Sequence, residues 1–286
     1  MKILVANAQI KPFLGDVESN LKLIEAQVKI AKKKNIKLLV FPELALTGYF
    51  LKDFVPDVSQ KKNSKLLRKI ASLSKGISIV LGFVEESSRH VFYNSAAYFE
   101  NEKLVYVHRK IYLPTYGMFD ESRYFGSGQR IKAFDTNLGR VAILICEDAW
   151  HPSLAFLASQ DGADFLIVPS SSPFRGTSQA KLKPKSTIER TWESILATYS
   201  ITYNQFVVFS NRVGYEDGVN FWGGSQIISP EGEILKKGSR SRASIYTAEI
   251  DTRDIRRSRI ASPTFRDEKI LLFQREFNRI QSSKKN

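Results

Sequence analysis

Cys146, the only cysteine of the chain, lies at the end of an apolar run and is the first candidate for chemistry. Residues 141–145 (VAILI) are predicted to form a buried strand, and Glu147 and Asp148 directly follow the cysteine. A thiolate is a strong nucleophile, but a free cysteine is also common as an inert core residue. Position alone therefore makes Cys146 a candidate nucleophile that still needs a base and a cation.

Histidine, the usual activator of a thiol, is poorly placed in this sequence. The chain has His90, His108 and His151. His151 follows Cys146 too closely for an obvious Cys–His pair, and the adjoining Trp150 and Pro152 indicate a turn. We interpret all three histidines as surface or packing residues, and we expect a His151→Ala variant to keep its activity.

Two charged residues at the ends of predicted strands offer the missing base and cation. Glu43 ends the apolar strand predicted at 37–43, where a carboxylate is costly unless it is paired or functional. Lys110 closes the strand KLVYVHRK, and an ammonium group near a thiol lowers the pKa of that thiol. A solvated charge at a strand end is the ordinary alternative for each. Together they supply what a thiol needs to attack an amide carbon.

Other reaction classes have no motif in this sequence. There is no HExxH, no CxxC and no pair of histidines at ligand spacing, so we expect no metal. There is no GxGxxG or GxxxxGK[ST] loop, so we expect no nucleotide cofactor. One cysteine excludes an internal disulfide and fits a reducing compartment, and no apolar run is long enough to span a membrane. The start of the chain is predicted to be a strand, so we expect a cytoplasmic protein.

The charge of the chain is strongly positive, with 43 Lys and Arg against 29 Asp and Glu, a net charge of +14. Such a balance raises the question of a nucleic-acid partner. The basic residues are dispersed, however, and no nucleic-acid motif accompanies them, so we interpret them as solvated faces. They are densest after residue 236, where a tail or arm could meet an acidic partner.

Strands and helices alternate along the chain, with hairpins inserted. Strands are predicted at residues 3–10, 37–43, 76–86, 139–148, 164–172, 207–214 and 243–251, and hairpins at 91–113 and 225–235. Helices are predicted at residues 20–34, 63–75, 153–159 and 187–202. No linker divides the 286 residues, so we expect one α/β domain with two sheets face to face and helices outside.

Three of the predicted strands end in polar residues that could share one location. Glu43 ends the second strand, Cys146 follows VAILI, and Ser170 to Ser172 follow FLIVP. In α/β sheets, sites form beyond the carboxyl ends of strands. The sequence therefore predicts that these side chains gather at one edge of the sheets.

Three separated motifs occur in order: residues 41–49 (FPELALTGY), 109–114 (RKIYLP) and 145–148 (ICED). This set resembles the nitrilase, or carbon–nitrogen hydrolase, superfamily along nearly the whole chain. The resemblance implies a four-layer α-β-β-α sandwich, with a hydrolase domain over residues 1–255. It leaves residues 256–286 as a basic extension, which we expect to be helical and a candidate for oligomer contacts.

Further segments narrow the resemblance to one branch. Residues 108–125 (HRKIYLPTYGMFDESRYF) are similar to the segment around the catalytic lysine in the glutaminase domain of glutamine-dependent NAD synthetases. Residues 171–174, 211–214 and 217–225 also resemble that branch. The sequence lacks the SGGxDS-type loop of the synthetase domain, so we do not expect a complete NAD synthetase.

The resemblance assigns Cys146 as the nucleophile, Glu43 as the general base and Lys110 as the cation beside the reacting carbon. Lys110 and the backbone N–H of Glu147 would hold the tetrahedral oxyanion, and one such donor contributes about 3 kcal/mol. Glu121 corresponds to a second glutamate of the family, which would orient Lys110 or the substrate. An exposed loop carboxylate is the alternative for Glu121.

Four residues fall where the resemblance implies substrate contacts: Tyr49, Phe119, Glu147 and Ser172. Core aromatics and a turn serine are the alternatives for three of them. Glu147 and Asp148 together could be a metal-binding pair, but we interpret them as an acidic turn after the nucleophile, which fits the family better. No metal or organic cofactor is implied.

Several functions remain open at this point. We favour a thiol amidase that releases ammonia from a small amide, with glutamine as the first substrate to try. The alternatives are an N-carbamoyl amine hydrolase, a nitrile hydrolase, and an ammonia-supplying subunit or inactive homologue that docks an acidic partner. The resemblance also implies a homodimer or larger assembly.

Overall fold

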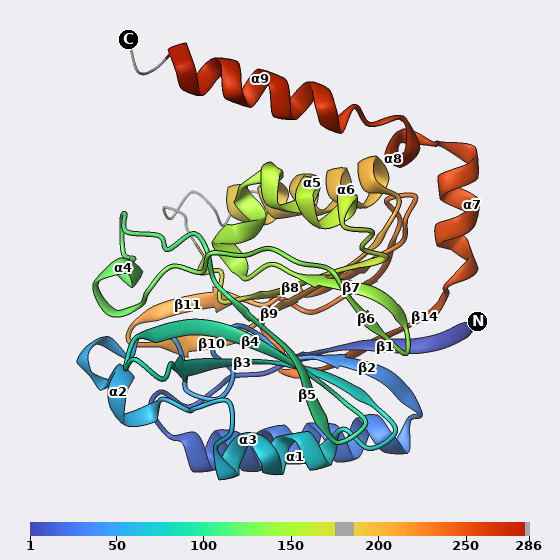
Figure 1. The fold of residues 1–286 in the computed structure, drawn as a ribbon. Coiled ribbons are helices and arrows are strands. Elements are labelled where there is room, and N and C mark those ends of the chain that lie inside the picture. The colour runs from blue at the N-terminus through green and yellow to red at the C-terminus, as the bar shows by residue number, and fades with distance from the viewer. Residues whose placement is uncertain (175–185, 284–286) are drawn as a thin grey trace.

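Two six-stranded β-sheets form the centre of the computed structural model, which describes residues 1–174 and 186–283 (Figure 1). The first sheet contains, in spatial order, β14 (Ser244–Asp251), β1 (Lys2–Gln9), β2 (Ile36–Val40), β3 (Ser78–Glu86), β4 (Phe92–Glu100) and β5 (Lys103–Arg109). The second contains β13 (Ile234–Lys237), β12 (Gln226–Ile228), β9 (Phe206–Asn211), β8 (Phe165–Ser170), β7 (Gly139–Ile143) and β6 (Phe134–Thr136).

Each sheet has three adjacent parallel strands with antiparallel strands on both sides. In the first sheet β1, β2 and β3 are parallel, and in the second β7, β8 and β9 are parallel. The carboxyl ends of β2, β7 and β8 lead directly into the segments that carry Glu43, Cys146 and Ser171. The polar residues that follow these parallel strands of the two sheets therefore lie at a shared edge.

Helices cover the outer face of each sheet, so the layers are α-β-β-α as predicted (Figure 1). Helices α1 (Val17–Lys33) and α3 (Lys65–Leu73) pack on the first sheet, and α5 (Pro152–Gln160) and α6 (Thr187–Tyr203) pack on the second. In α1 the buried residues Ile24, Val28 and Ala31 recur at helical spacing. Asp16 caps the amino end of this helix by accepting a hydrogen bond from the backbone of Ser19.

The inner faces of the two sheets enclose an apolar core. Strand residues from both sheets contribute to it, among them Val5, Val40, Val80, Tyr98, Val141, Ile143, Ile167 and Val208. Each fully buried side chain of this kind contributes about 1.5–3 kcal/mol. This core fixes how the strand ends of one sheet lie against those of the other.

Several predicted strands are longer than the observed ones. The strand predicted at 37–43 ends at Val40, and the one predicted at 139–148 ends at Ile143. The segment predicted at 207–214 divides into β9 and β10 (Val213–Glu216), and β10 pairs with β11 (Val219–Trp222) in a separate ribbon. In each case the regular ladder ends before the predicted boundary. The hairpins predicted at 91–113 and 225–235 are confirmed as β4–β5 and β12–β13.

Short elements that the sequence did not predict lie near the strand ends. They are the 3-10 helices η1 (Lys52–Phe54) and η2 (Cys146–Trp150) and the helices α2 (Val55–Val58) and α4 (Glu121–Tyr124).

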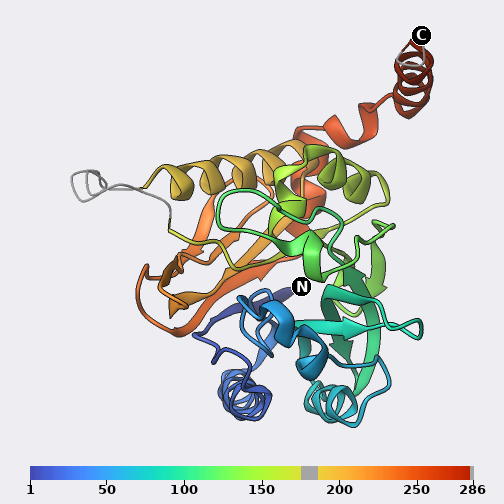
Figure 2. The same cartoon turned by 90° about the vertical axis from the view of Figure 1, so that its left-hand side faces the viewer.

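After β14 the described chain is largely helical, with α7 (Arg253–Ala261), α8 (Thr264–Asp267) and α9 (Ile270–Ser283). Helix α9 extends away from the sandwich (Figure 2). A domain boundary at residue 255 stays a prediction, and the last three residues of the extension lie outside the described chain. In the two described ranges, no helix has the length and apolar character that crossing a membrane requires.

Candidate active site

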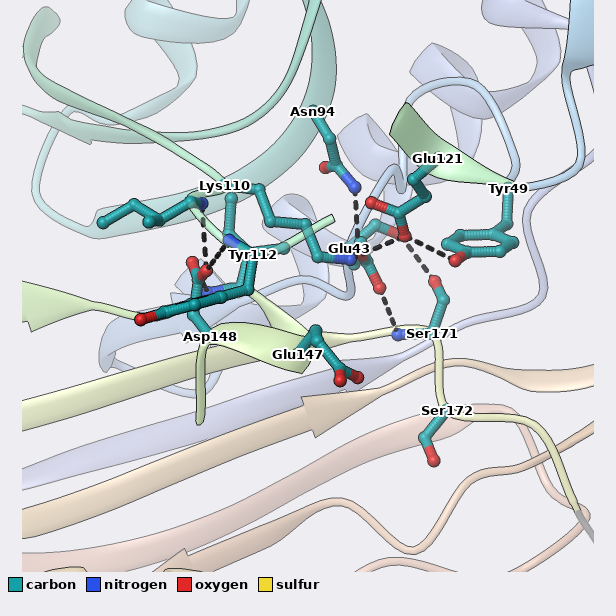
Figure 3. A network of polar contacts seen from close by, with 12 residues as sticks. Glu43, Tyr49, Asn94, Lys110, Tyr112, Glu121, Glu147, Asp148, Ser171 and Ser172 are labelled. Carbon is teal, nitrogen blue, oxygen red and sulfur yellow. Dashed lines mark hydrogen bonds and ion pairs between the residues drawn. The ribbon is translucent and has the colours of Figure 1, made fainter. Parts of the chain in front are cut away.

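The carboxylate of Glu43 lies in the turn that follows β2, held by donors from both sheets. Its Oε2 accepts the backbone N–H of Ser171 at 2.8 Å, and its Oε1 accepts Nδ2 of Asn94 at 2.8 Å (Figure 3). The next residue, Leu44, has a φ of 47°, which turns the chain back immediately after the carboxylate. Glu43 is 1% exposed, so these bonds replace the water that a carboxylate normally binds.

Lys110 lies between two carboxylates and is fully buried. Its Nζ donates to Oε1 of Glu43 at 2.7 Å and to Oε1 of Glu121 at 2.6 Å. Glu121 is the first residue of α4 and also accepts the hydroxyl of Tyr49 at 2.5 Å. The other oxygen of Glu121, Oε2, has no hydrogen-bond partner within the described chain. One ammonium group thus serves two buried carboxyl groups.

The electrostatics of this group follow from its burial. Burial alone would lower the pKa of Lys110, but Glu121 and Glu43 outweigh it and raise that pKa well above its usual value. Burial and the neighbouring Glu43 together raise the pKa of Glu121 to about 7, although Lys110 acts in the opposite direction. Lys110 therefore stays charged, while Glu121 is an acid that titrates near neutral pH.

Cys146 begins η2, directly beyond the end of β7. Its φ of 45° is unusual for a residue other than glycine, and such strain often marks a functional position. Burial raises the pKa of its thiol well above the usual range, Glu43 adds to this effect, and Lys110 opposes it. The ammonium lowers the thiol pKa as expected, but burial and the carboxylates outweigh it. The resting thiol is therefore protonated and needs a base in order to react.

A small cavity opens onto Cys146. It has a volume of about 50 Å³ and is lined by Tyr116, Phe119, Cys146, Glu147, Trp150, Ser172, Pro173, Ile188 and Trp192. One water needs about 10–15 Å³ measured in this way, so the cavity has room for a carboxamide group.

The structure brings three of the four predicted substrate contacts to this cavity and places the fourth elsewhere. Phe119, Glu147 and Ser172 line it beside the cysteine. Tyr49 does not line this cavity, because its hydroxyl is directed to Glu121. The alternative of an exposed loop carboxylate for Glu121 is wrong, since Glu121 is 5% exposed and paired with Lys110.

Sequence reasoning missed Asn94 and the part that Asp148 plays, and it grouped Ser171 with the polar strand ends without predicting its bond to Glu43. Asn94 lies on β4, where its side-chain Nδ2 donates to Glu43 and its backbone carbonyl oxygen accepts the backbone N–H of Lys110 at 2.8 Å. The available signal was weak: Asn94 is a polar residue in a strand made mainly of aromatic and small side chains. Asp148 was interpreted as part of an acidic turn, but it is fully buried.

The histidines lie where packing and surface roles predict, with one exception. His90 is exposed and pairs with Glu86, and the ring of His151 stacks on Tyr112 with centroids 3.3 Å apart. His108 is buried and donates to a carboxylate, Asp148. Across the described ranges, no group of three His, Cys, Asp or Glu side chains is arranged to hold a metal ion.

Comparisons with known proteins address the family and the fold of the chain. The family model described as carbon–nitrogen hydrolase matches residues 4–260. A glutamine-dependent NAD(+) synthetase of Thermotoga maritima is 32% identical over 92% of this chain and 44% of its own length. A "Probable nitrilase" of Schizosaccharomyces pombe is 28% identical over 88% of this chain and 90% of its own.

Solved structures show the same fold. The carbon–nitrogen hydrolase from Helicobacter pylori G27 superimposes with a TM-score of 0.86 at 25% identity, covering 96% of this chain and 98% of that one. The chain spans about half the length of the NAD synthetases that it matches.

Proposed function

The chain belongs to the carbon–nitrogen hydrolase family, and from that premise we propose that it cleaves a small carboxamide through a thioester on Cys146 and releases ammonia. It is thus an enzyme that acts on carbon–nitrogen bonds other than peptide bonds. The observation that carries the proposal is the fully buried Lys110, held between Glu43 and Glu121 beside the only thiol.

In the acylation step Glu43 removes the proton from the thiol, and the sulfur attacks the amide carbon. The C–S bond forms as the carbonyl π bond breaks, and Lys110 with the backbone N–H of Glu147 holds the resulting oxyanion. Glu43 then passes its proton to the amide nitrogen, and the C–N bond breaks to release ammonia. An amide nitrogen leaves poorly unless it is protonated, which is why the base must also act as an acid.

In the deacylation step a water molecule replaces the departed ammonia. Glu43 takes one proton from this water as its oxygen attacks the thioester carbon, and the same oxyanion contacts apply. The C–S bond then breaks, and the proton returns to sulfur, which regenerates the resting thiol. Because the pKa of Cys146 is raised, the departing sulfur takes up this proton and the thiol is the resting form.

Glutamine is the first substrate to test. The glutaminase resemblance supports it, as do the names of the relatives described above. The carboxylate of Glu147 at the cavity could pair with an ammonium group at the far end of the substrate. An ammonia-supplying role within a larger assembly is the second candidate, because the chain matches 44% of the length of a relative whose name pairs glutamine with NAD synthesis.

The expected homodimer or larger assembly stays a prediction. Exposed apolar side chains of α9 are its candidate contacts, and they include Leu271, Phe273 and Phe277.

Mass spectrometry of the intact protein tests the proposal directly. The wild-type protein and a Cys146→Ala variant are mixed with glutamine, other carboxamides and N-carbamoyl amines, and ammonia release is followed in parallel. We expect ammonia release and an acyl adduct that maps to Cys146, with neither in the variant. Turnover of carbamoyl amines alone would favour the hydrolase alternative. No adduct and no ammonia from any compound would overturn the proposal, unless both appear once a partner protein binds.

A further inference from the structure

Asp148, two residues beyond Cys146, is a fully buried carboxylate with four hydrogen-bond donors around it. Its Oδ1 accepts the backbone N–H groups of Ile111 and Tyr112, both at 2.9 Å (Figure 3). Its Oδ2 accepts the backbone N–H of Ile145 at 3.0 Å and Nε2 of His108 at 2.9 Å. A carboxylate has about four acceptor positions, so these donors use its whole capacity.

The four donors belong to the two segments that carry the reactive groups. Ile111 and Tyr112 directly follow Lys110, and His108 precedes it by two residues on β5. Ile145 directly precedes Cys146. The Asp148 carboxylate therefore links the residues on both sides of Lys110 to the residue that precedes Cys146.

The regular strands end just before both reactive residues, although the backbone N–H of Lys110 still donates to the backbone carbonyl of Asn94 on β4. β5 ends at Arg109 and β7 ends at Ile143, so Lys110 and Cys146 lie just beyond the ends of their strands. The N–H of Ile145, the first beyond the pairing of Leu144 with β8, is satisfied by Asp148.

We propose that Asp148 is a positioning residue that fixes the separation between the Lys110 ammonium and the Cys146 thiol. This inference rests on the proposed function, in which the two groups act on one carbonyl. A misplacement of about 1 Å at such a site can reduce the rate about 10²-fold. Asp148 is directed to backbone donors and to His108, so it acts through the two residues and not on the substrate.

An amide cannot replace the carboxylate here. Asparagine has the same shape, but its NH₂ group is a donor and would face either the N–H groups of Ile111 and Tyr112 or those of Ile145 and His108. Two buried donors would then lose their acceptor, and leaving such a group unpaired is costly. The two segments would move apart to admit water or to turn the amide.

His108 completes the arrangement from the core between the sheets. Because a carboxylate only accepts, Nε2 of His108 carries the hydrogen and Nδ1 does not. Nδ1 is buried and has no hydrogen-bond partner within the described ranges, so the ring has no other polar contact there to hold it. The ring thus supplies one hydrogen-bond donor to Oδ2 of Asp148.

Glu100 provides a matched control, because it is also a buried carboxylate that anchors backbone. It accepts the hydroxyl of Ser78 at 2.7 Å and the backbone N–H of Asn137 at 3.1 Å, away from the site. We expect Asp148→Asn to lower kcat about 10²-fold with little change in KM. Glu100→Gln should lower the unfolding temperature but leave kcat per folded molecule unchanged.

A second measurement needs no substrate and so separates this inference from the proposed function. Iodoacetamide modifies Cys146 at a rate that depends on its surroundings, and Asp148→Asn should slow this reaction severalfold while Glu100→Gln should not. The double variant Asp148→Asn with Lys110→Met should be no slower than Lys110→Met alone, since Asp148 acts through Lys110. The inference would be overturned if the two substitutions slowed alkylation independently, so that their effects multiplied in the double variant. It would also be overturned if the slower alkylation of Asp148→Asn were explained by its unfolded fraction alone. Both outcomes can be measured even if no amide is turned over.

His108 keeps the inference testable if Asp148→Asn does not fold. His108→Phe removes the donor, and His108→Gln keeps one at a similar position. We expect the alkylation rate of Cys146 to fall in the first variant and to return toward the wild-type value in the second. Equal rates in the two variants would overturn the inference.

Discussion

Two adjacent residues, Arg109 and Lys110, lead to two charge clusters with opposite properties. Successive side chains of a strand point to opposite faces, so the two cations leave the end of β5 in different directions. Each reaches buried carboxylates. Arg109 pairs with Glu85, and Lys110 pairs with Glu43 and Glu121.

The cluster around Glu85 has more cations than carboxylates. Both oxygens of Glu85 accept from Arg109, at 2.6 and 2.9 Å, while Lys62 lies 3.4 Å away and Ser95 donates a hydroxyl. Burial raises the pKa of Glu85, but Arg109 and the other donors outweigh it and the net direction is down. Arg109 also stacks on Tyr93 and remains 31% exposed.

The cluster around Lys110 has the opposite balance. One cation serves two carboxyl groups, and none of the three groups reaches solvent freely. The pKa of Glu121 is therefore raised where that of Glu85 is lowered. The comparison shows that two factors set the pKa of a buried carboxyl group: the number of cations that contact it and the degree to which the cluster is shielded from water. With more cations the group stays ionised, and with fewer cations and deeper burial it titrates at higher pH.

Removing the cation from each cluster gives the largest expected contrast. Lys110→Met should lower kcat about 10³-fold, because it removes the proposed oxyanion donor and leaves two carboxyl groups facing each other. Arg109→Met should cost about 2 kcal/mol in the free energy of unfolding and leave kcat per folded molecule unchanged. Steady-state kinetics and urea unfolding of both variants measure this. A comparable loss of kcat in both would remove the distinction.

The pH dependence of stability should have opposite signs in the two clusters. Because the folded pKa of Glu121 is raised, its contribution to stability is present below the ordinary value of 4.5 and is lost as pH rises toward about 7. Because that of Glu85 is lowered, its contribution is present above 4.5 and is lost as pH falls below that value. The measurement is the unfolding temperature of Glu121→Gln and Glu85→Gln, each compared with wild type between pH 4.5 and about 7 and below pH 4.5. The same slope in both variants would contradict the comparison.

The smallest effect is expected for Lys62. Its side chain is 49% exposed and Glu85 keeps the two bonds to Arg109 without it. Lys62→Ala should therefore lower the free energy of unfolding by less than about 1 kcal/mol, and salt should reduce the difference further. Urea unfolding at two salt concentrations measures it. A larger loss would mean that the second cation, and not only Arg109, keeps Glu85 ionised.

Much of the fold and the centre of the site could be predicted from the chain. The apolar periodicity of α1 and the alternation of β4 and β5 predict those elements, and the structure confirms them. Cys146 and Glu43 could be found because a polar residue at the end of an apolar run is costly and has few structural reasons.

The rest of the site could not be predicted, because it depends on contacts between distant segments. Ser171 meets Glu43 across 128 residues, and His108 meets Asp148 across 40. Such pairs are fixed by strand register and by how the two sheets pack, neither of which has a local signal. Two strand ends also differ from the prediction, because the apolar runs continue past Val40 and Ile143, where the regular ladders stop.

The sequence by itself determined most of the elements, the arrangement of the layers and which residues are candidates for the thiol nucleophile, the base and the cation. These follow from local periodicity and from the cost of polar groups at the ends of apolar strands. Only the tertiary structure decided that Lys110 is shared by two carboxyl groups, that the thiol is protonated at rest, and that Asp148 joins the two reactive segments. Those properties depend on burial and on distances between side chains, which exist only once the two sheets have packed together.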